Sequence, residues 1–320
     1  MSIADLLQDL KNETQNILTP DFQVEVVETK TVPDLADSTI TFANVEGQRI
    51  LCKTIETCIL FIDIRNSASI SVERQPQTLA RIYSSFVRSM ILAARYFDGH
   101  VRDIIGDRLM VVFDRERCFQ RAVDTAILMN TLSQYVIRPA VKRLVHDLEF
   151  RCGIGIDFGR MLVTKAGVPR KGNEREFYRS FVWLGKPANI ASRLTDIAHK
   201  EFSYQQQGVS VGFYYPSTET WRWEDISYER FMEHLKPTYS QVLKYDNEYF
   251  STFFKTSLPA SRTTYPPILM TEAVYTGLKS ENPDCDSVKK NLWAKQGNTI
   301  PEYTGHIYGG DVIFTAGKEL

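Results

Sequence analysis

The stretch LFIDIRNS, residues 60–67, places a carboxylate inside an otherwise apolar run. The residues before it, CILFI, form the continuous apolar pattern that is typical of a strand buried on both faces. Asp63 interrupts this pattern. Because an isolated buried charge is costly, Asp63 must be paired, bind a metal ion, or lie where the strand leaves the core.

The composition is that of an ordinary globular protein. The 320 residues include 43% hydrophobic and 24% charged residues, enough for one enlarged domain or for two. The five cysteines form no CxxC pair, which argues against a disulfide framework and a structural zinc site. The formal net charge of −1 gives no general attraction to nucleic acid or anionic lipid, so we expect neither nucleic acid nor a membrane as a partner.

The beginning of the chain and its apolar runs bear on its location. No apolar run approaches the roughly 20 residues of a membrane span. The start, MSIADLLQDLKNETQ, has the spacing of a short amphipathic helix rather than the apolar stretch of a signal peptide. We therefore expect a cytoplasmic protein.

The middle of the chain alternates between strands and helices. Apolar spacing predicts helices over about residues 77–97 and 117–136, and Gly106-Asp107 predicts the tight turn of a hairpin in HVRDIIGDRLMVVF. Further strands are expected from residue 58, in LEFRCGIGIDFG, in MLVTKAG and in SFVWLG, and a further helix begins at Pro187. This β-α-β-β-α-β order predicts an α/β (α+β) fold, a ferredoxin-like sandwich in which helices cover one face of a mainly antiparallel sheet.

Asp63 and Asp107 are expected to converge in this fold. The first strand and the hairpin are neighbours at the centre of the sheet, so the end of one lies beside the turn of the other. Two carboxylates at hydrogen-bond range repel each other unless a cation lies between them, and Mg²⁺ or Mn²⁺ prefers such oxygen ligands. Two ordinary roles remain open, because Asp63 could cap the following helix and Asp107 could serve only the turn.

Four segments together resemble a known family. FIDIRNS, IIGDRLMVVF, FRCGIGIDFG and LGKPANIASRL are similar to the signature segments of class III nucleotidyl cyclases, the adenylate and guanylate cyclase superfamily. The spacing agrees as well, because Asp107 follows Asp63 by 44 positions and Arg151 follows Asp107 by 44. The resemblance covers about residues 51–198. The N-terminal segment FQVEVVETKTVPDLADSTITF further resembles the pyrimidine cyclases of bacterial Pycsar anti-phage systems.

The resemblance implies a role for each matching position. Asp63 and Asp107, with the backbone carbonyl of Ile64, would hold two divalent metal ions, Mn²⁺ or Mg²⁺, beside a nucleoside triphosphate. The residues implied to bind the triphosphate are Asn66, Ser67, Ala68 and Arg151, and those implied to act in catalysis are Asn189 and Arg193. Because the family places the metal pair of one chain opposite the Asn/Arg helix of another, the resemblance also implies a homodimer with two equivalent sites.

Two positions bear on the choice of base. Where the purine cyclases carry lysine or glutamate this chain has Asp103, and where they carry Asp, Thr or Cys it has Val182, so neither purine pattern is met. A carboxylate at Asp103 can accept hydrogen bonds from guanine, uracil or cytosine, and hydrogen-bond counting leaves these bases open. The Pycsar-like N-terminus favours a pyrimidine, and the general tendency of that family favours UTP over CTP.

The regions around this core are expected to be additions to it. Residues 1–50 would form a helix and strand extension, and residues 51–320 the nucleotidyl cyclase catalytic domain. An aromatic-rich insertion is expected at about residues 199–263, where WRWEDISYERFMEHL has the spacing of a helix. Aromatic side chains near Lys and Arg can stack the bases of single-stranded nucleic acid, but core or interface packing is their more common role.

The implied function is therefore an enzyme that converts UTP to 3′,5′-cyclic UMP and diphosphate. Its product would be a second messenger for antiviral defence, read by a separate effector. A CTP-specific or purine cyclase remains an alternative. A catalytically silent nucleotide sensor predicts loss of a metal carboxylate or of the Asn/Arg pair, and all four residues are present. A polymerase-like palm needs a basic template channel, which the near-neutral charge does not indicate.

Overall fold

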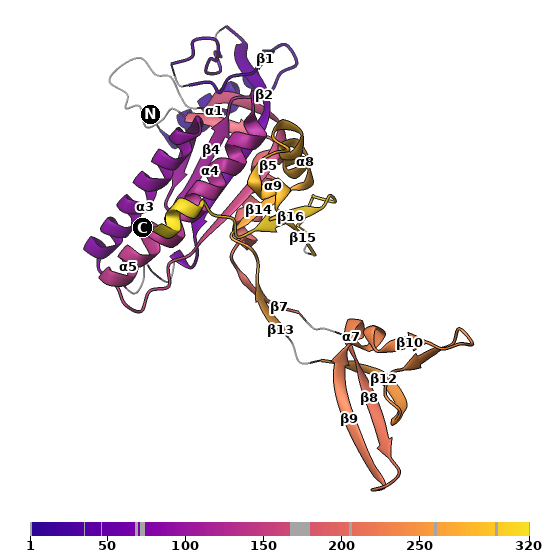
Figure 1. Cartoon of the computed structure of the whole chain (residues 1–320). Helices are drawn as coiled ribbons and strands as arrows, with labels where there is room; N and C mark the ends of the chain where they lie inside the picture. The colour runs from indigo at the N-terminus through magenta and orange to yellow at the C-terminus, as the bar shows by residue number, and fades with distance from the viewer. Residues whose placement is uncertain are drawn as a thin grey trace. The chain divides into compact units, whose positions relative to one another are not determined.

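The structure, a computed structural model, divides the chain into two compact units (Figure 1). Unit 1 comprises Met1–Lys200 and Tyr265–Leu320, and unit 2 comprises Glu201–Thr264. The residues that the structure describes are 2–34, 36–45, 47–67, 70, 74–166, 180–204, 207–258, 261–297 and 300–319.

A mainly antiparallel sheet forms the centre of unit 1. Its strand order is β15-β16-β14-β5-β2-β4-β3, with β1 paired to β2 and β6 paired to β5. The pairs β1·β2 and β14·β5 are parallel, and the other pairs are antiparallel. The strands are β1 Gln23–Thr29, β2 Arg49–Ile64, β3 Gly99–Ile105, β4 Arg108–Phe113, β5 Cys152–Ala166, β6 Ser180–Leu184, β14 Ile268–Thr271, β15 Ala294–Gln296 and β16 Ile307–Gly310.

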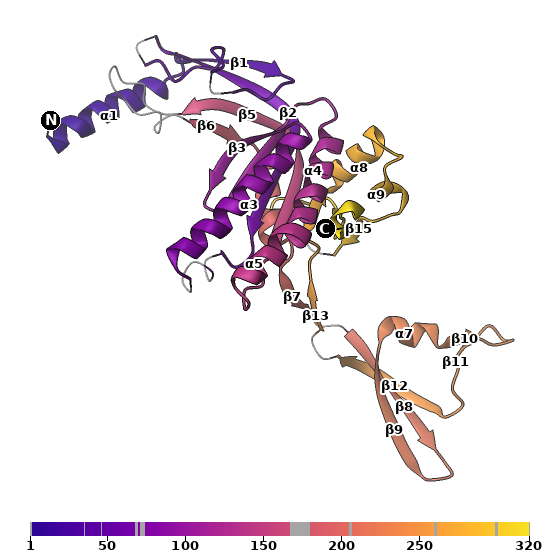
Figure 2. The ribbon, with the colours of Figure 1, turned by 60° about the vertical axis from the view of Figure 1, so that its left-hand side comes forward.

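Two long helices cover one face of this sheet. α3 (Pro76–Tyr96) and α4 (Cys118–Leu132) lie side by side across it in both views of the ribbon (Figures 1 and 2). Because side chains alternate along a strand, β2 sends its even-numbered residues toward these helices and its odd-numbered residues, Asp63 among them, to the other face. The core between the helices and the sheet includes Cys58, Leu60, Ile62, Phe86, Met90, Leu109, Val111, Phe113, Ala122, Val123 and Ala126.

The remaining helical elements of unit 1 are short or lie at its edges. Apart from the helix Lys186–Ile197, those after α4 are η1 Ser133–Ile137, a π-helical turn, α5 Arg138–Leu144, α8 Glu272–Glu281, α9 Asp286–Lys289 and the 3₁₀ helix η3 Thr315–Glu319. α1 Ile3–Ile17 precedes the sheet. No helix among the described residues is long and apolar enough to cross a membrane.

α6 (Lys186–Ile197) packs against the face of the sheet that carries Asp63. Gly155 of β5 lies directly beneath it, because a Cβ there would stand only 2.5 Å from the backbone nitrogen of Thr195. Gly153 is crowded in the same way by backbone atoms of Thr195 and Ala198. Thr195 also bonds to the sheet, its hydroxyl donating to the carbonyl oxygen of Phe61 at 3.2 Å. The glycines of FRCGIGIDFG therefore set how closely α6 approaches the end of β2.

The expected fold is confirmed. The order β2-α3-β3-β4-α4-β5 is the predicted alternation, and the helices α3 and α4 cover one face of a mainly antiparallel sheet. Three boundaries differ from expectation. LEFRCGIGIDFG and MLVTKAG form the single strand β5, which begins at Cys152. β2 begins at Arg49 because its first half pairs with β1, and the helix expected to end at 136 continues through η1 to Leu144.

Unit 2 is built on a three-stranded antiparallel sheet of order β12-β8-β9. One face of this sheet packs with α7 around Val209, Val211, Phe213, Ile226, Phe231 and Tyr245. The opposite face carries Trp221 and Trp223, whose rings stack 5.6 Å apart and are about half exposed. The elements are β7 Glu201–Tyr204, β8 Gln207–Tyr215, β9 Thr220–Ser227, α7 Tyr228–Glu233, β10 Leu235–Pro237, β11 Leu243–Tyr245, β12 Phe250–Ser257 and β13 Ser261–Thr264.

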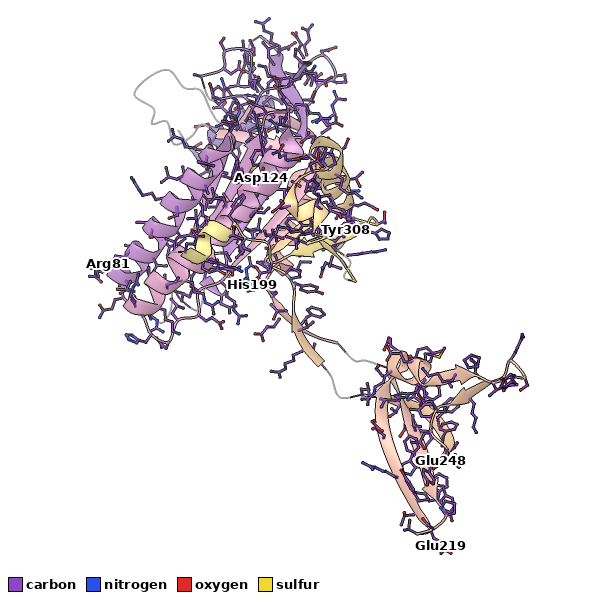
Figure 3. The ribbon with its side chains drawn as sticks, in the orientation of Figure 1. Arg81, Asp124, His199, Glu219, Glu248 and Tyr308 are labelled. Atoms are coloured by element: carbon purple, nitrogen blue, oxygen red, sulfur yellow. The ribbon has the colours of Figure 1, made fainter. Side chains whose placement is uncertain are left out.

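The stretch WRWEDISYERFMEHL departs from its predicted helix. It forms β9 followed by the single short helix α7. Trp221 and Trp223 alternate with polar residues at the period of a strand, and this alternation outweighs the helical spacing later in the stretch. Figure 3 labels Glu219, at the turn before β9, and Glu248, just before β12.

We predict that Gly155→Ala destabilises unit 1. Because the new methyl group meets the backbone of α6 rather than a flexible side chain, we expect the free energy of unfolding to fall by about 1–3 kcal/mol or more. Chemical denaturation followed by circular dichroism measures this loss. Gly297→Ala is the control, since a Cβ there meets nothing within 4 Å. Equal stability of the two variants would contradict the close packing of α6.

Candidate active site

Asp63 and Asp107 converge at the end of the central strand β2, as the sequence predicts. Asp63 is the penultimate residue of β2, and Asp107 lies in the turn between β3 and β4. Oδ2 of Asp107 accepts a hydrogen bond from the backbone N–H of Ile64 at 3.2 Å. Burial, and then the neighbouring carboxyl of Asp107, raise the pKa of Asp63, and Arg108 opposes this shift. Asp107 therefore lies close enough to disfavour the charge of Asp63.

Arg108 is the cation that offsets this repulsion. Its Nη2 lies 2.8 Å from Oδ2 of Asp63, and its Nε lies 3.3 Å from the same oxygen. Nη1 donates to the hydroxyl of Ser192 on α6 at 2.9 Å, and Nη2 also donates to the carboxylate of Asp196. Sequence reasoning missed Arg108, although it directly follows Asp107 in the hairpin. It also missed Ser192 and Asp196, because only the packing of α6 on the sheet brings them here.

A second arginine, Arg65, borders the same carboxylate. Its Nη2 is 3.7 Å from Oδ2 of Asp63, too far for a hydrogen bond, and its Nη1 donates to the carbonyl oxygen of Asp196 at 3.0 Å. Burial lowers the pKa of Arg65, and a Cβ on Gly153 would touch its guanidinium carbon at 3.0 Å. Arg65 is thus held by packing and by α6 more than by Asp63.

Two of the residues expected to bind phosphate, Asn66 and Arg151, have their backbones close to the end of β2. The backbone N–H of Arg65 donates to the carbonyl oxygen of Arg151 at 2.8 Å, so Arg151 stands beside the end of β2. Its side chain bonds to Glu149, with Nε 2.8 Å from Oε1. Asn66 has a φ of 58°, a left-handed conformation that Asn tolerates, and it ends the turn that begins at Arg65, after which Ser67 is helical. Ala68 lies outside the described residues.

The structure does not bring Asn189 and Arg193 to the carboxylates of the same chain. Asn189 is exposed on α6, and Arg193 donates to the carbonyl oxygen of Pro301 and to Oε1 of Glu302, both at 3.3 Å. The residues of α6 that reach the Asp63 cluster are instead Ser192 and Asp196. α6 therefore has one face turned to the carboxylates of its own chain and an adjacent face that carries Asn189 and Arg193.

The structure also separates the two residues expected to contact the base. Asp103 is exposed and accepts a hydrogen bond from the N–H of Ile104 at 2.9 Å, so its carboxylate is not covered within one chain. Asp103 pairs with Met110, whose side chain lies in the core on the face that carries Asp63. Val182 pairs with Thr164 of β5, and its neighbour Trp183 is the residue that packs into this core. Val182 thus points to the opposite face of the sheet. The spacing of residues in the sequence did not show which face Val182 occupies.

Distance along β5 separates Val182 further from the carboxylates. Asp63 pairs with Gly153 and Val182 pairs with Thr164, so these points are eleven residue steps apart along one strand. At about 3.3 Å per residue the separation along the strand is about 36 Å, longer than a nucleoside triphosphate.

The carboxylate pair fits a divalent cation. The pair offers hard oxygen ligands, and a cationic side chain already stands against Asp63. Within the described part of the chain, no group of three or more His, Cys, Asp or Glu side chains is placed to hold a metal ion. Two carboxylates are nevertheless the usual protein share of a Mg²⁺ site, where water and substrate phosphates supply the other ligands.

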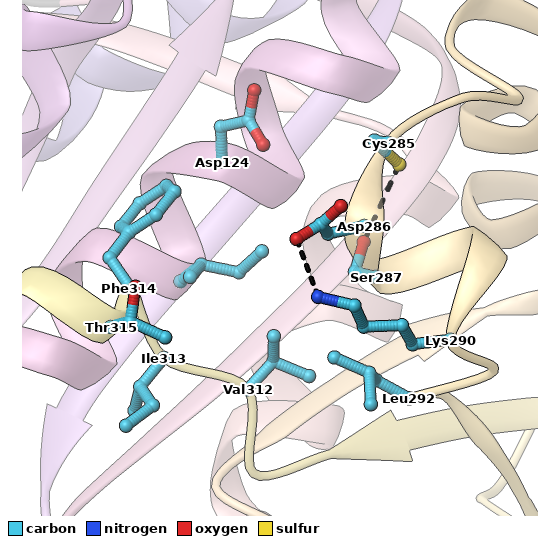
Figure 4. A pocket seen from close by; sticks show the side chains of 11 residues that line it. Asp124, Cys285, Asp286, Ser287, Lys290, Leu292, Val312, Ile313, Phe314 and Thr315 are labelled. Carbon is cyan, nitrogen blue, oxygen red and sulfur yellow. Dashed lines mark hydrogen bonds and ion pairs between the residues drawn. The ribbon is translucent and has the colours of Figure 1, made fainter.

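A separate hollow of about 320 Å³ lies between α4 and the C-terminal segment (Figure 4). The Asp124 carboxyl lines it, and burial raises the pKa of that group. Two further lining residues form an ion pair, in which Nζ of Lys290 lies 2.8 Å from Oδ2 of Asp286. Figure 3 labels Asp124 on α4 and His199 just after α6. Because none of the expected site residues lines this hollow, the carboxylate cluster is the better candidate for an active site.

Comparison with known proteins identifies the family. Residues 38–201, slightly more than half of the chain, match the family described as "Adenylate and Guanylate cyclase catalytic domain". The chain belongs to this family. It is therefore a class III nucleotidyl cyclase, and its substrate is a nucleotide. The resemblance drawn from the four sequence segments is confirmed.

Individual relatives of this cyclase are distant. It is 27% identical to a uridylate cyclase of Burkholderia cepacia over 62% of this chain and 80% of that protein. It is 31% identical to a cytidylate cyclase of Staphylococcus aureus over 35% of this chain and 28% of that protein. The crystal structure of the adenylyl cyclase CyaB from P. aeruginosa aligns with a TM-score of 0.49 and 14% identity over 80% of this chain and 94% of that chain.

Proposed function

We propose that this cyclase converts UTP to 3′,5′-cyclic UMP and diphosphate, with two divalent metal ions, in a site formed by two copies of the chain. The observation that carries the base assignment is the similarity to the B. cepacia protein named uridylate cyclase, which extends over 62% of this chain. The convergence of Asp63 and Asp107 supports the metal site.

The reaction joins two parts of one nucleotide. The ribose 3′-oxygen forms a bond to the α-phosphorus, the bond from that phosphorus to the bridging oxygen of the β-phosphate breaks, and the hydroxyl proton is released. Two metal ions, when held by Asp63, Asp107 and the carbonyl of Ile64, would lower the pKa of the 3′-hydroxyl and neutralise the triphosphate.

The chain's own residues would position the substrate for this step. The guanidinium of Arg151, whose backbone lies beside the end of β2, can bind phosphate oxygens with two parallel hydrogen bonds. Asn66 and Ser67, which follow the end of β2, would bind the same phosphates through their backbone N–H groups. Asn189 would orient the ribose, and Arg193 would stabilise the charge that develops at the α-phosphate.

A site shared between two chains is supported by the geometry of one chain. Arg193 bonds to Pro301 and Glu302 rather than to the Asp63 cluster, and Val182 lies about 36 Å along β5 from it. A second copy related by a two-fold axis would supply both residues to each carboxylate pair. Two equivalent sites would then form in a homodimer.

A hydrogen-bond acceptor on β3 is a further support for the choice of base. Asp103, exposed in one chain, would face the base once a second copy covers it, and its carboxylate can accept from the N3–H of uracil. The cytosine amino group is also a donor, so a CTP cyclase is the second candidate, and the S. aureus cytidylate cyclase supports it over 35% of this chain.

The product would act as a signal in defence against phage. This part of the proposal rests on the resemblance of the N-terminal segment to Pycsar cyclases, in which a separate effector reads the cyclic nucleotide. The presence of Asp63, Asp107, Asn189 and Arg193 together argues against a silent nucleotide sensor.

For the metal site, we expect Asp63→Ala and Asp107→Ala each to abolish cyclic nucleotide formation, by about 100-fold or more, because each removes a ligand. Product formation from UTP with Mn²⁺ is followed by mass spectrometry, and circular dichroism verifies folding. Asp225→Asn, an exposed carboxylate of β9, serves as the control. Turnover near the wild-type level in either alanine variant would remove these residues from the site.

For the shared site, we expect a mixture of inactive Asp63→Ala and inactive Arg193→Ala chains to regain activity. Random pairing gives half heterodimers with one intact site each, so about a quarter of the wild-type rate should return. A mixture of Asp63→Ala with Asp107→Ala should stay inactive, because both defects lie in the same half-site. Native mass spectrometry verifies the heterodimer, and its presence without recovered activity would refute sharing.

For the base, we expect UTP to be used in preference to the other nucleotides when all four triphosphates are supplied at equal concentration. Adenine has no ring N–H at the edge that Asp103 would read, so ATP should be disfavoured by about 10-fold or more. Asp103→Ala should lower the UTP preference without weakening Mn²⁺ binding. Cyclic AMP or cyclic GMP as the main product would refute a pyrimidine cyclase, and cyclic CMP would replace UTP by CTP.

A further inference from the structure

Arg108 makes more contacts with the candidate site than a surface ion pair would require. Its guanidinium bonds to Asp63, Ser192 and Asp196, which come from β2 and from α6. The side chain of Asp63 is only 17% exposed and that of Arg108 27%. A charge-assisted hydrogen bond in this half-buried place is stronger than one at the open surface.

The oxygen that Arg108 holds is one that a metal ion would need. Both Nη2 and Nε of Arg108 approach Oδ2 of Asp63, at 2.8 and 3.3 Å. A cation bound to that oxygen and the guanidinium would repel each other, because two positive charges would meet there. Arg108 and a metal ion therefore compete for Asp63.

Ser192 and Asp196 provide Arg108 with a second place to bind. Nη1 donates to the Ser192 hydroxyl at 2.9 Å, and Nη2 divides its two hydrogens between Asp63 and Asp196. If Arg108 releases Asp63, both contacts to α6 can remain. Its charge then stays paired with Asp196 instead of being left without a counter-ion.

We propose that Arg108 is an internal counter-ion that closes the metal site in the absence of metal. It holds Asp63 while no metal is bound, and it moves fully onto Asp196 and Ser192 when a divalent ion takes Asp63. This inference rests on the proposed metal role of Asp63. Its functional consequence is a raised metal requirement, since the apparent dissociation constant is the intrinsic one divided by the fraction of molecules in which Arg108 has released Asp63.

The test measures Mn²⁺ binding to the full chain without nucleotide, by electron paramagnetic resonance of the free ion. Arg108→Gln removes the competitor, so the dissociation constant for Mn²⁺ should fall on the order of 10-fold, as expected if Arg108 is engaged in nine molecules of ten. The melting temperature should respond in parallel. Without metal, Arg108→Gln should have a lower melting temperature than wild type, because Asp63 and Asp196 each lose an ion pair, and Mn²⁺ should raise its melting temperature more than that of wild type.

Arg65→Gln is the matched control for charge. Arg65 lies 3.7 Å from the same oxygen without a hydrogen bond to it. Its removal therefore lowers the local positive charge as much as the removal of Arg108 does, but it breaks no hydrogen bond to Asp63. A comparable gain in Mn²⁺ affinity in both variants would reduce the effect to general electrostatics and overturn the proposal. An unchanged or weaker affinity in Arg108→Gln would overturn it as well.

Asp196→Asn tests the second place of binding. In wild type it should weaken Mn²⁺ binding, because Arg108 then loses the counter-ion that it would move to, and in the Arg108→Gln background it should have little effect. An equal effect in both backgrounds would contradict the proposed movement. Asp63→Ala distinguishes failure of the proposed metal site from failure of the proposed role of Arg108. If Asp63→Ala binds Mn²⁺ as tightly as wild type, Asp63 is not a metal ligand and the proposed metal site is refuted. If Asp63→Ala loses Mn²⁺ binding while Arg108→Gln binds Mn²⁺ as wild type does, only the role of Arg108 is refuted.

Discussion

The repulsion between two neighbouring carboxylates is the constraint around which unit 1 is arranged. Asp63 ends the central strand and Asp107 sits in the adjacent turn, so the same pairing that builds the sheet forces the two charges together. These two negative charges require positive charge nearby, and within one chain Arg108 and Arg65 provide it. The packing of α6 on Gly153 and Gly155 then brings Ser192 and Asp196 to the arginines. The fold thus brings two carboxylates close together and also positions the arginine side chains that neutralise their charge.

Local pattern was sufficient to predict the elements that carry this site. A carboxylate in an apolar strand, a Gly-Asp turn and a glycine-rich strand each indicate one feature, and the spacing of the four segments indicates their family. Those elements occur where expected, and the two acids do converge. Their catalytic and metal-binding roles stay predictions.

The contacts between elements were beyond what the sequence could predict. In the sequence, Arg108 looks like an ordinary hairpin residue, and Ser192 and Asp196 look like residues of a solvent-exposed helix face. Only the packing of α6 on the sheet brings the three side chains into contact. The side of the sheet that Val182 occupies depends on the register of β6 against β5, which no single stretch determines. The strand β9 shows the same limit, because alternation and helical spacing overlap in WRWEDISYERFMEHL.

The unbroken pairing of β5 with β2 has a consequence for how such a chain can evolve. The register runs without a shift from Lys53 opposite Val163 to Ile64 opposite Cys152. One inserted residue in β5 would turn every side chain beyond it to the other face, carrying the glycines away from α6 and placing bulky side chains beneath it. An insertion in the glycine-bearing part of β5 should therefore disturb this unit more than a conservative substitution there, whereas loops and unit 2 are freer to change in length.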